Sequence, residues 1–272
     1  MEQTTQPMIT KHQNETGLMT LTGEQKEAFR RDGVLPLRQI VPQELVQSAQ
    51  RAINAYIGEY GIDPAKLNHY RSRSYCDDLS NTSAIKDLLS QSPLFGVAEQ
   101  LIGQGQVDEA GWGQVALRFP RPLPPEGEAD TPSSPHPHLD GMYSPHNGVQ
   151  EGTIANFTAL VGVLLSDVPE QNSGNFTYWP GTHLQYEEYF RLHTPQSLLN
   201  GLPPIQMPEP VQFTGKAGDA VLVHYQIAHG IAANLSPNTR YAIFFRLTHK
   251  NHDQYKWECM TDVWKEWKGI ER

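Results

Sequence analysis

The sequence has few cysteines and no long hydrophobic run. Its 272 residues include two cysteines, Cys76 and Cys259. Because they lie far apart in the chain, we expect reduced thiols in a cytoplasmic protein, which excludes a disulfide framework. The longest apolar run, at about residues 160–165, is far shorter than the roughly 18 residues that span a bilayer. This excludes a transmembrane helix, and we expect a soluble globular protein.

Basic residues are too few for a nucleic-acid-binding protein. The chain has 21 Lys and Arg against 30 Asp and Glu, which gives a formal net charge of -9. Such a chain repels a phosphate backbone, so we expect no nucleic-acid partner. The expected partner is a small-molecule substrate, bound by a monomer or a homodimer. Residues 1–20 are polar and lack the apolar segment of a secretory signal, so we expect a loose leader there.

Residues 21–103 carry helical patterns and are expected to form a mostly helical supporting region. The signals are capping residues before apolar stripes and Gly after them. Helices are predicted from Thr22 to Gly33, from Pro42 to Gly61, and over residues 83–89 and 93–102, with a short strand at 34–37.

Residues 104–250 change to short alternating or β-branched runs that Gly, Pro, Asn and Asp interrupt. This pattern is typical of an all-β sandwich or barrel. We therefore expect a mainly β protein with flanking helices, in a single domain over residues 21–272. Residues 251–272 are rich in Trp and are expected to pack on the core. The predicted strands are 113–119, 138–142, 153–165, 175–179, 211–213, 220–224 and 240–248.

His138 and Asp140 lie two residues apart on a predicted strand. Side chains alternate along a strand, so the imidazole and the carboxylate are expected to share one face. With one more distant His, they would make the two-His, one-carboxylate triad that holds Fe(II) and leaves coordination positions open. We choose His229 as the third ligand, because it ends an apolar stretch and precedes Gly230, which lets backbone and cofactor come close. The alternative is a surface His beside a turn-forming Asp.

Arg240 follows His229 by eleven residues, enough for the chain to turn and return on a neighbouring strand. A buried guanidinium does not lose its proton and therefore needs an anion. That anion is either the carboxylate of a ligand or one of the protein's own acidic side chains. The residues alone leave both possibilities open.

Several motifs occur in a fixed order along the chain. They are LTGEQKEAFRRDGVLPLRQIVPQELV, then PHPHLDG, then SGNFTYWPGTH, and finally GKAGDAVLVHYQIAHGIAANLSPNTRYAIFFRL. In this order they resemble the N-terminal helix, strand and helix, the HxD strand, the Asn-Gly turn with its following loop, and the distal His and Arg strand of the phytanoyl-CoA dioxygenase family. The resemblance covers most of the chain.

The resemblance implies a double-stranded β-helix core, a jelly roll like that of cupins. It assigns His138, Asp140 and His229 to Fe(II), and Arg240 to the distal carboxylate of the co-substrate 2-oxoglutarate. With dioxygen, such enzymes convert 2-oxoglutarate to succinate and CO2 and hydroxylate an unactivated carbon of their substrate. Related halogenases replace the metal-bound carboxylate by a small residue, so Asp140 argues against halogenation.

The near end of 2-oxoglutarate has no residue assigned by the resemblance. An ungapped count puts Gly162 where some relatives have a Trp beside the co-substrate. Thr158, Asn156 and Gln114 are candidates, because each offers hydrogen-bond donors. The alternative for each is ordinary hydrogen bonding in the protein interior.

Specificity is expected to come from loops at the mouth of the barrel, over residues 68–78, 120–137 and 143–152. We expect a small or medium organic substrate, in specialised metabolism. The alternative is that the polar candidates are solvated and the aromatic ones belong to the core. The candidates are Arg71, Arg73 and Arg118 for a carboxylate or phosphate, Tyr143 and Trp179 for an apolar skeleton, and His136 beside the metal strand.

Two other kinds of function use the same residues. A cupin-type isomerase or hydrolase with zinc or manganese could employ the same three ligands without oxidation. A desaturase or rearrangement enzyme would share the ferryl chemistry of the hydroxylase. A silent binding module of the same fold is a further alternative. Arg240 discriminates: a cavity for a diacid beside it favours the oxygenase, whereas an ion pair with a protein carboxylate favours the cupin.

Overall fold

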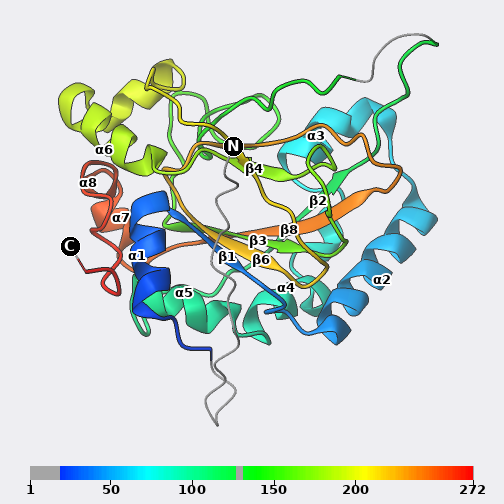
Figure 1. Ribbon diagram of the computed structural model, residues 1–272, viewed down its shortest axis with the longest axis horizontal. Coiled ribbons are helices and arrows are strands. Elements are labelled where there is room, and N and C mark those ends of the chain that lie inside the picture. The colour runs from blue at the N-terminus through cyan, green and yellow to red at the C-terminus, as the bar shows by residue number, and fades with distance from the viewer. Residues whose placement is uncertain (1–18, 127–130, 272) are drawn as a thin grey trace, which may run out of the picture.

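The computed structural model describes residues 19–126 and 131–271. Apart from its last two residues, the predicted leader 1–20 lies outside this range. Two antiparallel sheets face each other, with strand orders β1-β6-β3-β8-β2 and β5-β4-β7. Figure 1 shows the smaller sheet above the larger one, with α4 and α5 below the larger sheet. This arrangement confirms the expected fold class, a mainly β jelly roll with flanking helices.

Most predicted strands are present: those at 34–37 and 220–224 have the predicted bounds, whereas several others are shorter than predicted. The larger sheet contains β1 (Val34–Leu37), β2 (Gln114–Arg118), β3 (Ala159–Leu164), β6 (Ala220–His224) and β8 (Arg240–Leu247). The smaller sheet contains β4 (Phe176–Tyr178), β5 (Val211–Gln212) and β7 (His229–Ile231). The predicted strand 153–165 was too long at its start, because residues 153–158 belong to no helix or strand.

The helices gather before and after the sheets. They are α1 (Gly23–Asp32), α2 (Gln43–Tyr60), α3 (Leu67–Ser72), α4 (Ser83–Ser90), α5 (Leu94–Ile102), α6 (Thr182–His193), α7 (His252–Tyr255) and α8 (Glu258–Thr261), with 3-10 turns at Pro64–Lys66, Asp77–Leu79 and Pro195–Asn200. Thr22 caps α1 in a reciprocal capping box with Gln25, as the residue types predict. None of the described helices is long and apolar enough to cross a membrane.

Gly33 ends α1 in the left-handed conformation, with φ of 71°. A Cβ there would lie 2.5 Å from the Ile227 side chain and 2.7 Å from Nδ1 of His183. The close approach explains why only glycine fits between the first helix and the sheet.

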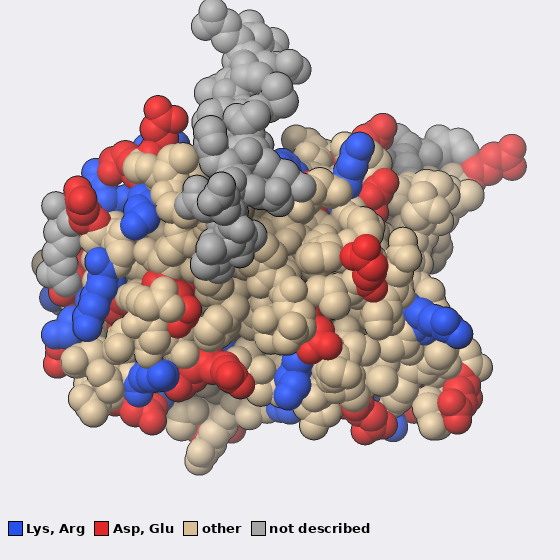
Figure 2. Space-filling view, turned by 90° about the horizontal axis from the view of Figure 1, so that it is seen from below, with Lys and Arg blue, Asp and Glu red and all other residues tan. Residues whose placement is uncertain are grey.

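Figure 2 views the molecule from below, where acidic and basic side chains are interspersed on the surface.

The C-terminal segment packs against the first helix. Trp267 is 2% exposed, and its ring lies 4.9 Å from that of Phe29. Trp264 also contacts Phe29, at 6.1 Å between ring centroids. The prediction was wrong for Trp257, which is 40% exposed.

Two buried histidines lie beneath this C-terminal cover. The Nε2 of His224 lies 2.8 Å from the carbonyl of Val263, and its Nδ1 accepts from the backbone N–H of Gln226 at 3.0 Å. Both contacts fit the neutral imidazole, with the proton on Nε2. Burial lowers the pKa of His224 to about 4. Burial, together with the nearby His224, also holds the pKa of His183 well below its ordinary value.

These histidines predict a loss of stability in mild acid. An unfolded His has a pKa near 6.5, so below that pH the unfolded chain binds protons that the folded chain excludes. Stability is therefore complete above about pH 6.5 and falls toward pH 4, by about 3 kcal/mol from His224 alone. Urea denaturation of the metal-free protein across this range measures it. The His224→Gln variant should show a flatter pH dependence, whereas His193→Gln, at an exposed position, should match the wild type.

Candidate metal centre and its cavity

His138 and His229 are brought together by their backbones. The N–H of each donates to the carbonyl of the other, at 2.9 and 3.0 Å, in an isolated antiparallel bridge. The predicted strand 138–142 was wrong beyond His138, because the chain turns at Asp140 and Gly141. Gly141 has φ of 81°, and a Cβ there would lie 2.3 Å from the carbonyl oxygen of Ala155. The turn therefore depends on glycine.

The turn brings Asp140 between the two imidazoles. Its Oδ1 lies 3.6 Å from Nε2 of His138 and 3.6 Å from Nε2 of His229. All three donor atoms lie within 4.8 Å of one another. The Nδ1 of His229 lies 3.0 Å from the Ile227 carbonyl, which fits an N–H donor there and leaves the Nε2 lone pair directed at Asp140.

The spacing of these atoms suits a metal ion. A contact of 3.6 Å is too long for a hydrogen bond. An ion with bonds of roughly 2.0–2.2 Å to nitrogen and oxygen can reach all three atoms across such gaps. Two imidazoles and one carboxylate are the ligand set of non-haem Fe(II) sites with open positions. The side chain of His138 is 50% exposed and that of His229 is 8% exposed, so the site opens to solvent on the His138 side.

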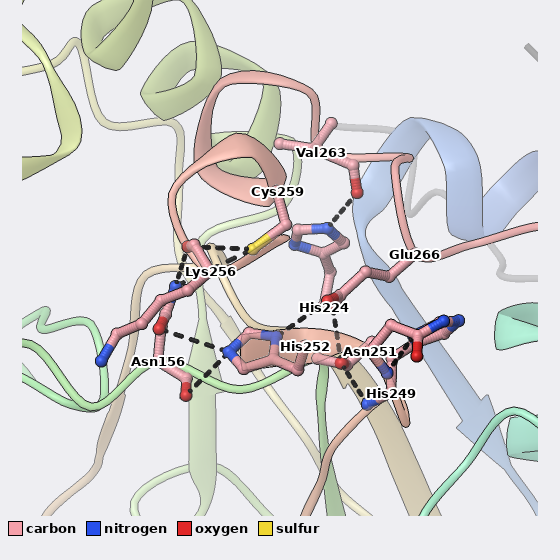
Figure 3. Close-up of polar contacts among 10 residues, drawn as sticks. Asn156, His224, His249, Asn251, His252, Lys256, Cys259, Val263 and Glu266 are labelled. Atoms are coloured by element: carbon pink, nitrogen blue, oxygen red, sulfur yellow. Dashed lines mark hydrogen bonds and ion pairs between the residues drawn. The ribbon is translucent and has the colours of Figure 1, made fainter. Parts of the chain in front are cut away.

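A second group of potential ligands behaves differently. His252, Cys259 and Glu266 are all buried, and their donor atoms also lie within 4.8 Å of one another. Here, however, Nδ1 of His252 already contacts Oε1 of Glu266 at 2.8 Å, and the Cys259 thiol donates to the Lys256 carbonyl at 3.3 Å. Figure 3 shows the His252 ring between Asn156 and Glu266. This cluster is a closed hydrogen-bond network that fastens the C-terminal segment to the chain before β3.

Arg246 was missed by the sequence predictions. Its Nε and Nη2 contact Oδ2 of Asp140 at 3.0 and 2.8 Å, and its Nη1 donates to Oε1 of Gln114 at 3.1 Å. The guanidinium also lies 5.8 Å from the ring centroids of Trp112 and Phe157. Alternation along β8 could have revealed it, because residues 240 and 246 are an even number apart and share a face.

Arg246 also fixes the charge of the carboxylate. Burial by itself would raise the pKa of Asp140, but the Arg246 charge and the adjacent imidazoles of His138 and His229 hold that pKa well below its ordinary value. Asp140 is thus an anion with one oxygen held by Arg246 and the other facing the imidazoles. That arrangement favours binding of a cation by Oδ1 alone.

A cavity of about 440 Å³ lies beside the three candidate ligands. Its apolar wall comes from Leu160, Phe176, Ile231 and Phe244. Its charged and polar lining comprises Arg71, Ser72, Tyr75, Gln114, Arg118, Tyr143, Ser144, Asn147, Arg240 and Arg246, together with the three candidate ligands. The structure thus brings five predicted contacts into one space with the candidate ligands: Arg240, Gln114, Tyr143, Arg71 and Arg118.

Arg240 is 3% exposed and has no acidic partner among the described residues. Its Nε donates to the Gly174 carbonyl at 2.8 Å, and its Nη1 to the Ala116 carbonyl at 2.9 Å. Burial, together with the Arg118 charge, lowers the pKa of Arg240 to about 9. A buried cation held only by carbonyl groups is suited to an anionic ligand.

Arg118 lies directly opposite Arg240 on the neighbouring strand. Gly174 makes room for both, because a Cβ there would lie 2.9 Å from Cβ of Arg118 and 3.2 Å from Cβ of Arg240. Like charges at directly opposed positions are unfavourable in a sheet. An anion bound between or beside them would relieve the repulsion.

Phe244 occupies the space beside Gly162. The two residues are opposed on β8 and β3, and a Cβ at Gly162 would lie 2.7 Å from the Phe244 ring. Phe244 therefore supplies an aromatic wall of the cavity from the neighbouring strand. This explains how the chain can have glycine at the position where the ungapped count expects Trp.

The structure does not bring Thr158 and Asn156 into the cavity. Thr158 donates to Oε2 of Glu266 at 2.6 Å, and Asn156 donates to the Lys256 carbonyl at 2.6 Å. Both side chains belong to the network that holds the C-terminal segment. Of the three candidates for the near end of 2-oxoglutarate, Gln114 alone lines the cavity.

Three expected substrate contacts also lie outside the cavity lining. Trp179 is 6% exposed and belongs to the core behind the smaller sheet. Arg73 extends toward Gly148 in the neighbouring loop. His136 is exposed, and its carbonyl lies 2.6 Å from where a Gly230 Cβ would be. The absent side chain of Gly230 therefore makes room for the His136 backbone rather than for a cofactor.

One known protein family matches most of the chain. The family model described as phytanoyl-CoA dioxygenase (PhyH) matches residues 29–242. Comparison with curated proteins gives no match.

Among solved structures, the chain is similar to SnoN, a non-heme alpha ketoglutarate dependent epimerase from nogalamycin biosynthesis. The two are 20% identical, the match covers 83% of this chain and 81% of that chain, and the TM-score is 0.55. It is also similar to HygX from Streptomyces hygroscopicus with nickel, 2-oxoglutarate and hygromycin B bound, with 17% identity, coverage of 84% and 88%, and a TM-score of 0.53. At these identities the likeness concerns the fold.

The contacts of Arg246 predict a role in holding Asp140 for metal binding. Arg246→Lys keeps the positive charge but loses the planar fork that binds Asp140 and Gln114 together. We expect Ni(II) to bind about tenfold more weakly, because the carboxylate is no longer fixed. Calorimetric titration of the metal-free protein measures this, with the surface change Arg30→Lys as control. An unchanged Ni(II) affinity would show that the ion pair does not orient the carboxylate.

Proposed function

The chain belongs to the phytanoyl-CoA dioxygenase family, and from this membership we propose that it is an Fe(II)- and 2-oxoglutarate-dependent hydroxylase. Its substrate is a small or medium organic molecule, hydroxylated at an unactivated carbon. The observation that carries the proposal is the joint position of two elements in one cavity. These are the His138, Asp140 and His229 triad and the buried Arg240, which has no acidic partner among the described residues.

The residues present fit the metal and the co-substrate. His138, Asp140 and His229 would hold Fe(II), and Arg240 would bind the distal carboxylate of 2-oxoglutarate. When bound, iron and 2-oxoglutarate would activate dioxygen, the oxidant: 2-oxoglutarate would give up two electrons and take one oxygen atom as it becomes succinate and CO2, and the other oxygen atom would oxidise the substrate carbon. A cupin-type isomerase or hydrolase would have no need of a buried guanidinium that only backbone carbonyls hold.

The protein's own side chains prepare this chemistry in three ways. His229 directs an unprotonated Nε2 at the centre because the Ile227 carbonyl occupies its Nδ1. Arg246 keeps Asp140 ionised and turned so that Oδ1 faces the imidazoles. Phe176 and Phe244 line the cavity and limit the access of water to the reacting groups.

Loss of any candidate ligand should abolish activity. His138→Ala, Asp140→Ala and His229→Ala each remove one ligand from a three-ligand site, so we expect no Fe(II)-dependent succinate formation. Succinate released from 2-oxoglutarate with Fe(II) and ascorbate measures it. His136→Ala, beside the site but outside the cavity, serves as the matched control. Undiminished succinate release in a ligand variant would remove that residue from the metal.

Arg240 should control co-substrate binding more than the chemical step. We expect Arg240→Ala to raise the apparent KM for 2-oxoglutarate at least tenfold, because the distal carboxylate loses its charged partner. Arg240→Lys keeps the charge without the fork and should give an intermediate KM. Steady-state kinetics with 2-oxoglutarate as the varied reactant test this. An unaltered KM in Arg240→Ala would contradict the assigned role.

A further inference from the structure

The cavity has a charge opposite to that of the whole protein. The chain carries a net charge of -9, yet four arginines and one carboxylate line the cavity. The arginines are Arg71, Arg118, Arg240 and Arg246, and the carboxylate is Asp140. Ferrous iron and the 2-oxoglutarate dianion cancel each other's charge. An excess of three positive charges therefore remains for the described lining after both have bound.

Two of these arginines have partners already assigned. Arg246 is paired with Asp140 at 2.8 Å, and Arg240 faces the co-substrate in the proposed function. Arg71 and Arg118 are left, and neither has a carboxylate within ion-pair distance in the part of the chain that the structure describes. Most of the other arginines with an ion pair lie on the outer surface, such as Arg30 with Glu27.

Arg71 and Arg118 come from separate elements, and both line the cavity. Arg71 lies on α3 and is exposed, whereas Arg118 ends β2 and is half-buried. Burial, and next the charge of Arg71, lower the pKa of Arg118. The two guanidiniums thus act on each other across the cavity, although no acidic side chain there compensates them.

We propose that the primary substrate is an organic anion whose carboxylate or phosphate group binds between Arg71 and Arg118. The proposal rests on the proposed function and names the substrate class for that site. Bidentate binding of such groups is the interaction for which guanidinium is best suited. The cavity also has apolar lining from Leu160, Ile231 and the Phe176 and Phe244 rings, which fits the apolar part of such a substrate.

The proposal can be tested without the natural substrate. The protein is loaded with Ni(II) and 2-oxoglutarate and titrated calorimetrically with phenylacetate, phenyl phosphate and the neutral phenylacetamide. We expect at least one anion to bind with a Kd of about 1 mM or tighter, and phenylacetamide to bind at least tenfold more weakly. The two anions also distinguish a carboxylate from a phosphate site.

Variants connect this binding with the two arginines. Arg71→Gln and Arg118→Gln should each raise the Kd of the bound anion at least tenfold. Arg71→Gln should leave the Kd of 2-oxoglutarate within threefold, whereas Arg118 lies opposite Arg240 and is tested by its effect on the anion alone. Arg73→Gln is the matched control, because Arg73 lies two residues from Arg71 but outside the cavity lining; it should change neither Kd. Thermal unfolding of each variant confirms that it is folded.

Three outcomes would overturn the proposal. They are equal binding of phenylacetamide, no binding of either anion, and loss of 2-oxoglutarate affinity in Arg71→Gln, which would assign that arginine to the co-substrate. Failure of the proposed function is a separate result. It would appear as wild-type protein that binds no 2-oxoglutarate in the presence of Ni(II), whatever the anion titrations give.

Discussion

The reciprocal hydrogen bonds between His138 and His229 make one site from segments far apart in the chain. The backbone N–H of each residue donates to the carbonyl of the other, at 2.9 and 3.0 Å, which fixes the two imidazoles on adjacent segments of the chain. Asp140 then needs only a tight turn to reach both rings. Since the ligand atoms repel or compete for protons when no ion is bound, the backbone pairing and Arg246 must hold them in place.

Charge is distributed unevenly between the interior and the surface. The acidic surface keeps the net charge away from zero, which favours solubility. The cavity contains the opposite excess, and burial makes each unpaired guanidinium costly. A protein tolerates such a cost where a ligand repays it. The unpaired arginines of the cavity are therefore suited to form salt bridges with the anionic groups of bound molecules.

The candidate ligands and Arg240 could be proposed from the sequence because their signals are local: an HxD motif, a His before Gly, and an Arg that begins a later strand. Arg246 was accessible to the same alternation. Thr158 and Asn156 could not be placed correctly, because their partners come from the C-terminal segment; Glu266 is 108 residues from Thr158. The turn at Gly141 could not be predicted from the sequence either, since it depends on the close approach of the Ala155 backbone.

The C-terminal segment contributes residues to the buried interior of the protein. Glu266 and Trp267 are 1% and 2% exposed, and they close over His224 and the chain that enters β3. During synthesis these residues leave the ribosome after both sheets have emerged. The flank of the jelly roll that contains His224 and Thr158 therefore stays uncovered until residues 266 and 267 have emerged, so the order of synthesis makes it the last part of the interior to close.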